Sequence, residues 1–190
     1  ANLTADDTDN LWTIASKGGI LPLVELARGG TNEAKEHAAN VLWNLASEHN
    51  DHQDAIASWG CDYQAAITSA GGIEPLIELA RGGTDGAKEY AALALAELAC
   101  DNPANQATIA SEDGIKPLIA LVRDGTEGAK EQVANVLANL SRDDGNKAVI
   151  VEADGIALLV KLARDACGKG RAERHAARAL ANLSFDRQYL

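Results

Sequence analysis

The sequence predicts an all-α protein that is built as a solenoid of about four three-helix repeats. Of its 190 residues, 46% are hydrophobic but only 4% are aromatic, which is typical of close-packed helices rather than sheets. A second observation is internal repetition, because one long phrase occurs four times along the chain. A third is that glycine, proline and threonine recur at matching places in the copies, where helices are expected to begin and end.

The repeated phrase sets the boundaries of the units. Its four copies begin at Gly18, Gly71, Asp113 and Asp154. Each copy ends in a leucine, and these closing residues are Leu45, Leu98, Leu140 and Leu183. They lie 53, 42 and 43 residues apart, so one interval is eleven residues longer than its neighbour. We therefore expect a single array over residues 1–190, with units at approximately 4–45, 46–98, 99–140 and 141–183 and the insertion in the second.

Three helices are predicted in each unit, separated by glycine. The first is short, as in NQATIAS (105–111), and we expect Gly114 to end it in the left-handed conformation. The second carries a proline in its first turn, where the missing N–H costs nothing; these are Pro22, Pro75 and Pro117. The third is the longest, and a threonine is expected to cap it; these are Thr31, Thr84 and Thr126.

The third helix also carries an apolar stripe. In the first unit its members fall at positions i, i+3, i+4 and i+7, and they are Ala38, Val41, Leu42 and Leu45. No unit can bury such a stripe alone. Stacking of neighbouring units buries it, which is why the sequence predicts a solenoid.

The insertion repeats a short helical phrase, QDAIAS at 53–58 and QAAITS at 64–69. An eleven-residue shift makes about three helical turns, so it restores nearly the same face. We expect the second copy to dock through Ile67, because it leads directly into Gly71, at the position of Ile14, Ile109 and Ile150 in the other units. The first copy, with Ile56, is predicted to form an extra helical turn broken near Trp59, which either anchors a partner or has no role.

Charge and composition exclude several classes of function. The net charge of −11 argues against a nucleic-acid partner, since phosphate binding needs a basic surface. No apolar run approaches the ~18 residues of a membrane span, and the N-terminus lacks the features of a signal peptide. Only three cysteines occur, and they are widely scattered. These features predict a soluble, intracellular protein, in the cytoplasm or the nucleus.

Catalytic and metal sites are not predicted. The segment RGGTDGAK lacks the Gly-Lys-Ser/Thr of a phosphate-binding loop, and no strand precedes it. His49, His52 and Cys61 resemble zinc ligands in type, but a fourth ligand at the usual spacing is missing. Glu-Lys neighbours such as Glu127 and Lys130 indicate solvated helix faces. We expect no enzymatic activity, no metal and no cofactor.

The repeated motifs resemble those of a known family. G-I-x-P-L-[IV]-x-L opens the second helix and A-N-V-L-x-N-L-[AS] closes the third, over essentially the whole chain. Both are similar to armadillo repeats, closest in pattern to plant and protist armadillo proteins and related to importin-alpha and beta-catenin. The resemblance implies a right-handed superhelix whose third helices line a concave groove that binds an extended peptide.

The same resemblance implies which residues face the peptide. In the family an asparagine near the end of each third helix bonds the peptide backbone, and the matching positions here are Asn2, Asn44, Glu97, Asn139 and Asn182. The positions one turn earlier hold tryptophan in importin-alpha; here they are Asn40, Leu93, Asn135 and Arg178. Recognition of nuclear-import signals is therefore not expected, although Glu97 would attract a basic side chain. The groove wall is extended by His37, Tyr90, Gln132 and His175, and Trp43 either anchors a ligand or packs between units.

Two functional hypotheses remain open at this stage. The first is a protein-interaction scaffold that binds an extended peptide, with the asparagines as ligand-binding groups instead of simple helix caps. The second is a structural or self-assembling module that forms homo-oligomers through its terminal units. Its exposed apolar residues would be Leu3, Leu11, Ile14, Leu180 and Leu183.

Overall fold

The structure, a computed structural model, describes residues 4–47, 62–166 and 170–184. These residues form helices and no strand, which confirms the all-α prediction. The first two groups of helices are α1 (Thr4–Ser16), α2 (Ile20–Gly29) and α3 (Asn32–Ser47), then α5 (Tyr63–Ser69), α6 (Ile73–Gly82) and α7 (Asp85–Ala99). The last two are α8 (Pro103–Ser111), α9 (Ile115–Asp124) and α10 (Glu127–Leu140), then α11 (Asp144–Glu152), α12 (Gly155–Asp165) and α13 (Arg171–Ser184).

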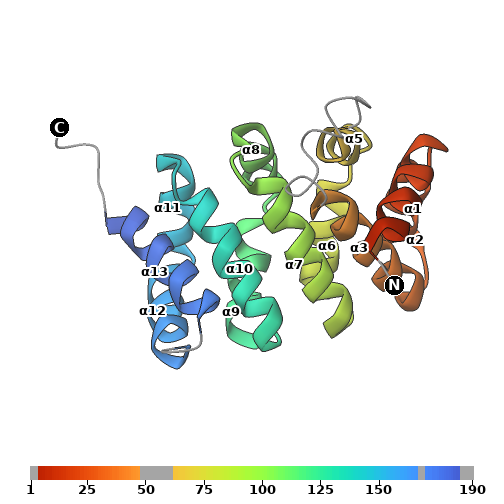
Figure 1. Ribbon diagram of the computed structural model, residues 1–190. Coiled ribbons are helices and arrows are strands. Elements are labelled where there is room, and N and C mark those ends of the chain that lie inside the picture. The colour runs from red at the N-terminus through yellow and green to blue at the C-terminus, as the bar shows by residue number, and fades with distance from the viewer. Residues whose placement is uncertain (1–3, 48–61, 167–169, 185–190) are drawn as a thin grey trace.

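Helices of one kind lie together along the array. Figure 1 shows α3, α7, α10 and α13 side by side, with α5, α8 and α11 above them and α9 and α12 below. Neighbouring third helices pack directly on one another, and each also packs on the second helix of its own unit. The predicted solenoid of three-helix units is therefore confirmed.

The turn after the first helix is a Schellman turn. After α5, the N–H of Gly71 donates to Thr68 O at 2.9 Å, and that of Gly72 donates to Ile67 O at 2.9 Å. Gly71 has φ +72°, a value that glycine adopts without strain. Gly72 must also lack a side chain, because a Cβ atom there would lie 2.7 Å from Ile67 Cγ2. The turn thus packs the first helix tightly against the start of the second.

The expectation that Gly114 adopts the left-handed conformation is wrong. Its φ is −74°, and the left-handed residue is Asp113, with φ 55°. The residue just past the helix takes the positive φ, and in each unit it is the first member of the Gly-Gly or Asp-Gly pair. The second member lies at the start of the next helix, where a Cβ atom would clash with the isoleucine of the preceding helix.

Caps and prolines lie where the sequence places them. The Oγ1 atoms of three threonines accept a hydrogen bond from the backbone N–H three residues later, at 3.1 or 3.2 Å. These residues are Thr31, Thr84 and Thr126. The prolines occupy the first turn of the second helix, at Pro22, Pro75 and Pro117.

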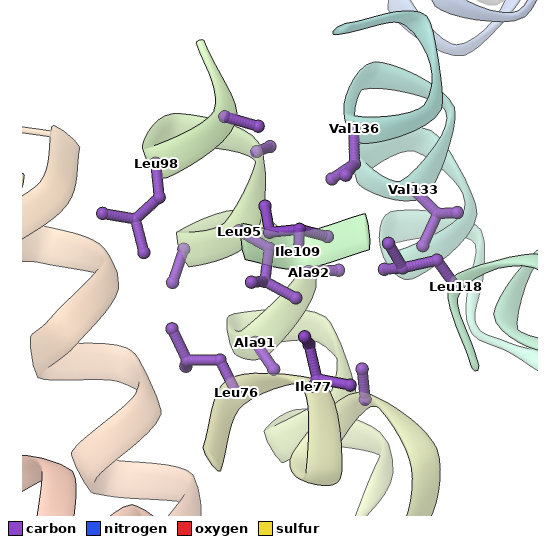
Figure 2. Packing of buried hydrophobic residues seen from close by; sticks show 14 of the residues in the cluster. Leu76, Ile77, Ala91, Ala92, Leu95, Leu98, Ile109, Leu118, Val133 and Val136 are labelled. Atoms are coloured by element: carbon purple, nitrogen blue, oxygen red, sulfur yellow. The ribbon is translucent and has the colours of Figure 1, made fainter. Parts of the chain in front are cut away.

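The core runs continuously through the array. Figure 2 shows part of this core, with buried side chains of α6, α7 and α8 on one side and buried side chains of α9 and α10 on the other. The labelled residues include Ile77, Leu95, Leu98, Ile109, Leu118, Val133 and Val136, all at most 3% exposed. In the third-helix stripe Ala38, Leu42 and Leu45 are buried and Val41 is half-buried. Burial of this stripe requires the neighbouring unit.

The second copy of the duplicated phrase docks as expected. Ile67 in α5 is fully buried, as are Ile109 and Ile150 at the same position of later units. Asp62 caps α5 by accepting from the N–H of Ala65 at 3.0 Å. The first copy, with Ile56 and Trp59, lies outside the described residues.

The predicted apolar surface of the terminal units has a different composition. Leu11, Ile14, Leu180 and Leu183 are half-buried rather than exposed, and the three leucines pack against the hydrophobic core. Leu3 lies outside the described residues. Among the residues whose exposure the structure describes, the exposed large apolar side chains are instead Trp12, Leu21, Leu26, Val151, Ile156 and Val160. Within the described ranges, no helix is long and apolar enough to cross a bilayer.

Candidate functional site

The third helices bring four of the predicted site residues into one row. Each residue lies in the last turn of its helix, and the four helices are consecutive neighbours in the array. We call Asn44, Glu97, Asn139 and Asn182 the ladder residues, and the surface formed by α3, α7, α10 and α13 the third-helix face (Figure 1). Asn2 lies outside the described residues. The four side chains differ in environment.

Asn44 is bonded within its own helix. Its Nδ2 donates to Oδ1 of Asn40, one turn earlier, at a long distance of 3.4 Å. Both side chains are half-buried. A bond of that length is weak, so both amides keep most of their capacity for an incoming ligand.

Glu97 replaces asparagine in the second unit. It is half-buried, and burial raises the pKa of its carboxyl above the ordinary value because the charged form loses hydration. No hydrogen bond to another described residue satisfies its carboxylate. Leu93, one turn earlier, is half-buried and offers only apolar contact. This part of the face presents an acidic group that a cation would stabilise.

Asn139 is the one buried ladder residue, at 4% exposure. Its Oδ1 accepts a hydrogen bond from Nη2 of Arg178, in the next unit, at 3.0 Å. The same Nη2 donates to Oδ1 of Asn135 at 2.8 Å. The Nδ2 of Asn139 is buried and has no hydrogen-bond partner among the described residues. An unsatisfied buried donor of this kind costs about 1–3 kcal/mol.

Asn182 is used to connect units. Its Nδ2 donates to Ala138 O at 2.9 Å and to Ser141 Oγ at 3.2 Å, both in or next to α10. It therefore satisfies carbonyl and hydroxyl groups at the end of the preceding third helix. Of the four ladder residues, this one is committed to the fold.

The predicted aromatic and histidine positions also lie on the third helices. Trp43 stacks on Tyr90 of the next unit, with ring centroids 6.0 Å apart and planes at 27°. Both rings are half-buried, so Trp43 packs between neighbouring units. His37 is exposed, and its Nε2 lies 3.9 Å from Oε1 of Glu33. The pKa of His175 is lowered, first by burial and then by the charge of Arg178.

Sequence reasoning missed a second set of contacts between units. Glu36 accepts a hydrogen bond from the capping hydroxyl of Thr84 in the next unit, and Glu89 accepts one from Thr126 at 2.8 Å. Glycine follows two residues after each threonine, because a Cβ at Gly86 or Gly128 would meet the glutamate carboxylate. The signal was present in the sequence, since a glutamate follows the capping threonine by five residues in each of the first three units.

The described residues contain no group of three His, Cys, Asp or Glu that is placed to hold a metal ion. His49, His52 and Cys61 lie outside them.

No protein-family model and no curated protein matches the chain. Several solved structures do. An engineered protein has 26% identity over 93% of this chain and 66% of its own, with a TM-score of 0.77. A designed armadillo repeat protein, in complex with a (KR)4 peptide, has 22% identity over 95% and 71% of the two chains and a TM-score of 0.77.

A protein from Plasmodium falciparum is also similar in structure. The armadillo repeats only protein ARO from Plasmodium falciparum has 20% identity over 97% of this chain and 81% of its own, with a TM-score of 0.72. The chain spans 66% of the first engineered protein and 40% of another. Likeness at this level of identity shows the fold.

Proposed function

We infer that this chain, an armadillo-repeat solenoid, is a protein-interaction scaffold whose third-helix face binds an extended segment of a partner protein. The observation that carries the proposal is the incomplete use of polar groups at three ladder residues. Asn44 makes only a long bond within its own helix, the half-buried Glu97 carboxylate has no hydrogen-bond partner among the described residues, and Asn139 has a buried, unpartnered Nδ2. Polar groups that are half-buried or buried without partners favour a ligand that supplies them.

An extended backbone is the ligand that suits such a row. It presents N–H and C=O groups at regular intervals, and an amide side chain offers both a donor and an acceptor. Third helices that pack directly on one another lie about 8–10 Å apart, so three junctions span a strand of roughly eight residues. A designed armadillo repeat protein of the same fold was solved with a (KR)4 peptide, which supports a peptide as the ligand type.

The partner should be neutral or basic overall, since the chain has a net charge of −11. The charge is unevenly distributed. Residues 154–190 contain seven Lys or Arg against four Asp or Glu, whereas the rest of the chain is strongly acidic. A segment with basic and acidic parts would therefore bind in a defined direction.

The ladder is tested by Asn44→Ala combined with Asn139→Ala. The probe is a library of synthetic peptides, roughly ten residues long, measured by fluorescence polarisation against the whole chain. The double variant should weaken the peptides that bind by about 1–3 kcal/mol, because hydrogen bonds to a desolvated backbone are lost. Asn32→Ala, at the exposed start of α3, is the matched control and should bind like the parent. Equal affinity of the double variant and the parent for every peptide would show that the ligand binds elsewhere.

Self-association is a second candidate, and one specific observation favours it. Ile156 and Val160 of α12 are 41% and 39% exposed. The residues at the same repeat positions in the three earlier units are at most 8% exposed; they are Ile20, Val24, Ile73, Ile77, Ile115 and Ile119. Each of those pairs is covered by the following unit. The α12 surface thus has the residues of an inter-unit junction, which a second copy of the chain would cover.

Light scattering over a range of concentrations tests this candidate. Dimers or larger species should appear as the concentration rises, and Val160→Lys should abolish them without changing the helical circular dichroism. A monomer at every concentration would remove self-association from consideration.

A further inference from the structure

We propose that Arg178 makes the third-helix face selective for an acidic side chain, aspartate or glutamate, in the bound segment. The guanidinium leaves Asn139 to bind the ligand carboxylate, and its departure opens Asn139 to the ligand backbone. This inference rests on the proposed binding of an extended segment. It adds a chemical requirement at one position of that segment, which the ladder alone does not impose.

Arg178 is hydrogen-bonded to two asparagines of the neighbouring third helix. The side chain crosses from α13 to α10, where a single atom, Nη2, donates to Asn135 Oδ1 at 2.8 Å and to Asn139 Oδ1 at 3.0 Å. Its Nε and Nη1 make no hydrogen bond to a described residue, and it forms no salt bridge with one. The residue itself is exposed. An arginine held in place, with free donors and no counter-ion, is prepared for an anionic group.

Asn139 supplies the second, independent observation. It is the one buried ladder residue, while Asn44, Glu97 and Asn182 remain half-buried. Its Nδ2 is inaccessible to solvent and has no partner among the described residues. A buried donor without a partner is rare in native proteins, and it destabilises the arrangement in which Arg178 binds Asn139. A ligand carbonyl would satisfy Nδ2, and in our proposal it reaches this atom once Arg178 has left the neighbouring Oδ1.

These two features together produce selectivity. A neutral segment must displace Arg178 from two asparagine oxygens, and it offers no charged group that could replace these hydrogen bonds to the guanidinium. A segment with a carboxylate replaces those two bonds with charge-assisted hydrogen bonds, which are stronger. Both segments then gain the bond to Asn139. The difference between them is the interaction with Arg178, and it disfavours the neutral ligand.

The neighbouring unit carries the opposite charge. Glu97 of α7 occupies the ladder position next to Asn139, and its carboxylate has no cation beside it among the described residues. Both charges act on one thiol, since the pKa of Cys100, raised mainly by burial, is also raised by Glu97 and lowered by Arg178. A basic side chain about two residues from the acidic one would lie on the same side of a strand and face Glu97. The expected segment is therefore bipolar.

The test is a positional-scanning library of synthetic peptides, roughly ten residues long, in which one position at a time is fixed. The parent chain should prefer aspartate or glutamate over alanine at one position by about ten-fold or more, the scale of a charged hydrogen bond. Arg178→Ala should remove the preference. Compared with the parent chain, this variant should bind acidic peptides more weakly and neutral peptides more tightly. Arg164→Ala, an exposed arginine of α12, is the matched control and should keep the parental preference.

Two further variants keep the test decisive. Arg178→Lys retains the charge but cannot bridge both asparagines, so it should bind neutral peptides more tightly and still prefer acidic ones. Glu97→Gln should lose the preference for a basic residue and keep the acidic one. Circular dichroism confirms that each variant is folded.

The outcomes separate the two proposals. If peptides bind and Asn44→Ala with Asn139→Ala weakens them, but no position prefers an acid, the role of Arg178 is overturned and the proposed function stands. Tighter binding of acidic peptides by Arg178→Ala would overturn the role as well. Failure of every peptide to bind the parent would overturn both.

Discussion

The inner junction between α7 and α10 and the last junction between α10 and α13 join the same kinds of helix by different means. At the inner junction, Glu89 accepts from the hydroxyl of Thr126, beside the first turn of α10. At the last one, Glu131, the corresponding residue, lies 3.7 Å from Arg171, and Arg178 and Asn182 cross to α10 instead. Repeat geometry is therefore maintained by the apolar core, while the polar contacts between third helices differ from unit to unit.

The largest expected effect concerns that core. Leu137 of α10 is fully buried, whereas Leu180, at the same repeat position in α13, is half-buried. Leu137→Ala should lower the free energy of unfolding by roughly 2–5 kcal/mol, the range for a buried leucine. Leu180→Ala should cost about half as much, because fewer neighbours surround it. Urea denaturation followed by circular dichroism measures both, and equal losses would show that the last unit is packed as tightly as the inner one.

A smaller effect is expected from the two glutamates. Glu89→Ala removes a hydrogen bond to Thr126, and we expect a loss of about 1 kcal/mol. Glu131→Ala removes only a long ion pair to an exposed arginine, and such pairs contribute about 0–1 kcal/mol. The same denaturation curves test this difference. If Glu131→Ala is the more damaging change, charge rather than the capping contact holds these junctions together.

Much of this architecture could be predicted from the sequence. The threonine caps, the prolines and the docking of Ile67 follow from local chemistry, because each depends on residues close together in the chain. The contacts between Glu89 and Thr126 and between Arg178 and Asn139 could not be predicted in this way. The first contact joins residues that are 37 positions apart in the chain, and the second joins residues that are 39 positions apart. Both depend on how one unit is rotated relative to the next. The left-handed Asp113 shows a local failure, since glycine was expected to take the positive φ that aspartate adopts.

The smallest expected effect is a pH dependence at Glu97, which has no counterpart at the last junction. Burial raises its pKa in the folded chain, so the folded state holds its proton to a higher pH than the unfolded state does. Over the interval between the two pKa values, stability therefore falls as the pH rises, and at neutral pH the ionised Glu97 destabilises the fold. Glu97→Gln should accordingly raise the unfolding midpoint slightly at pH 7, and the gain should disappear below the unfolded-state pKa, where both proteins carry a neutral side chain. Thermal denaturation at several pH values measures this.

Glu25→Gln, at an exposed position of α2, is the control and should leave the midpoint at pH 7 unchanged. A midpoint that falls in Glu97→Gln at pH 7 would mean that a cationic group already neutralises this carboxylate, and the basic side chain proposed for the ligand would then have no role there.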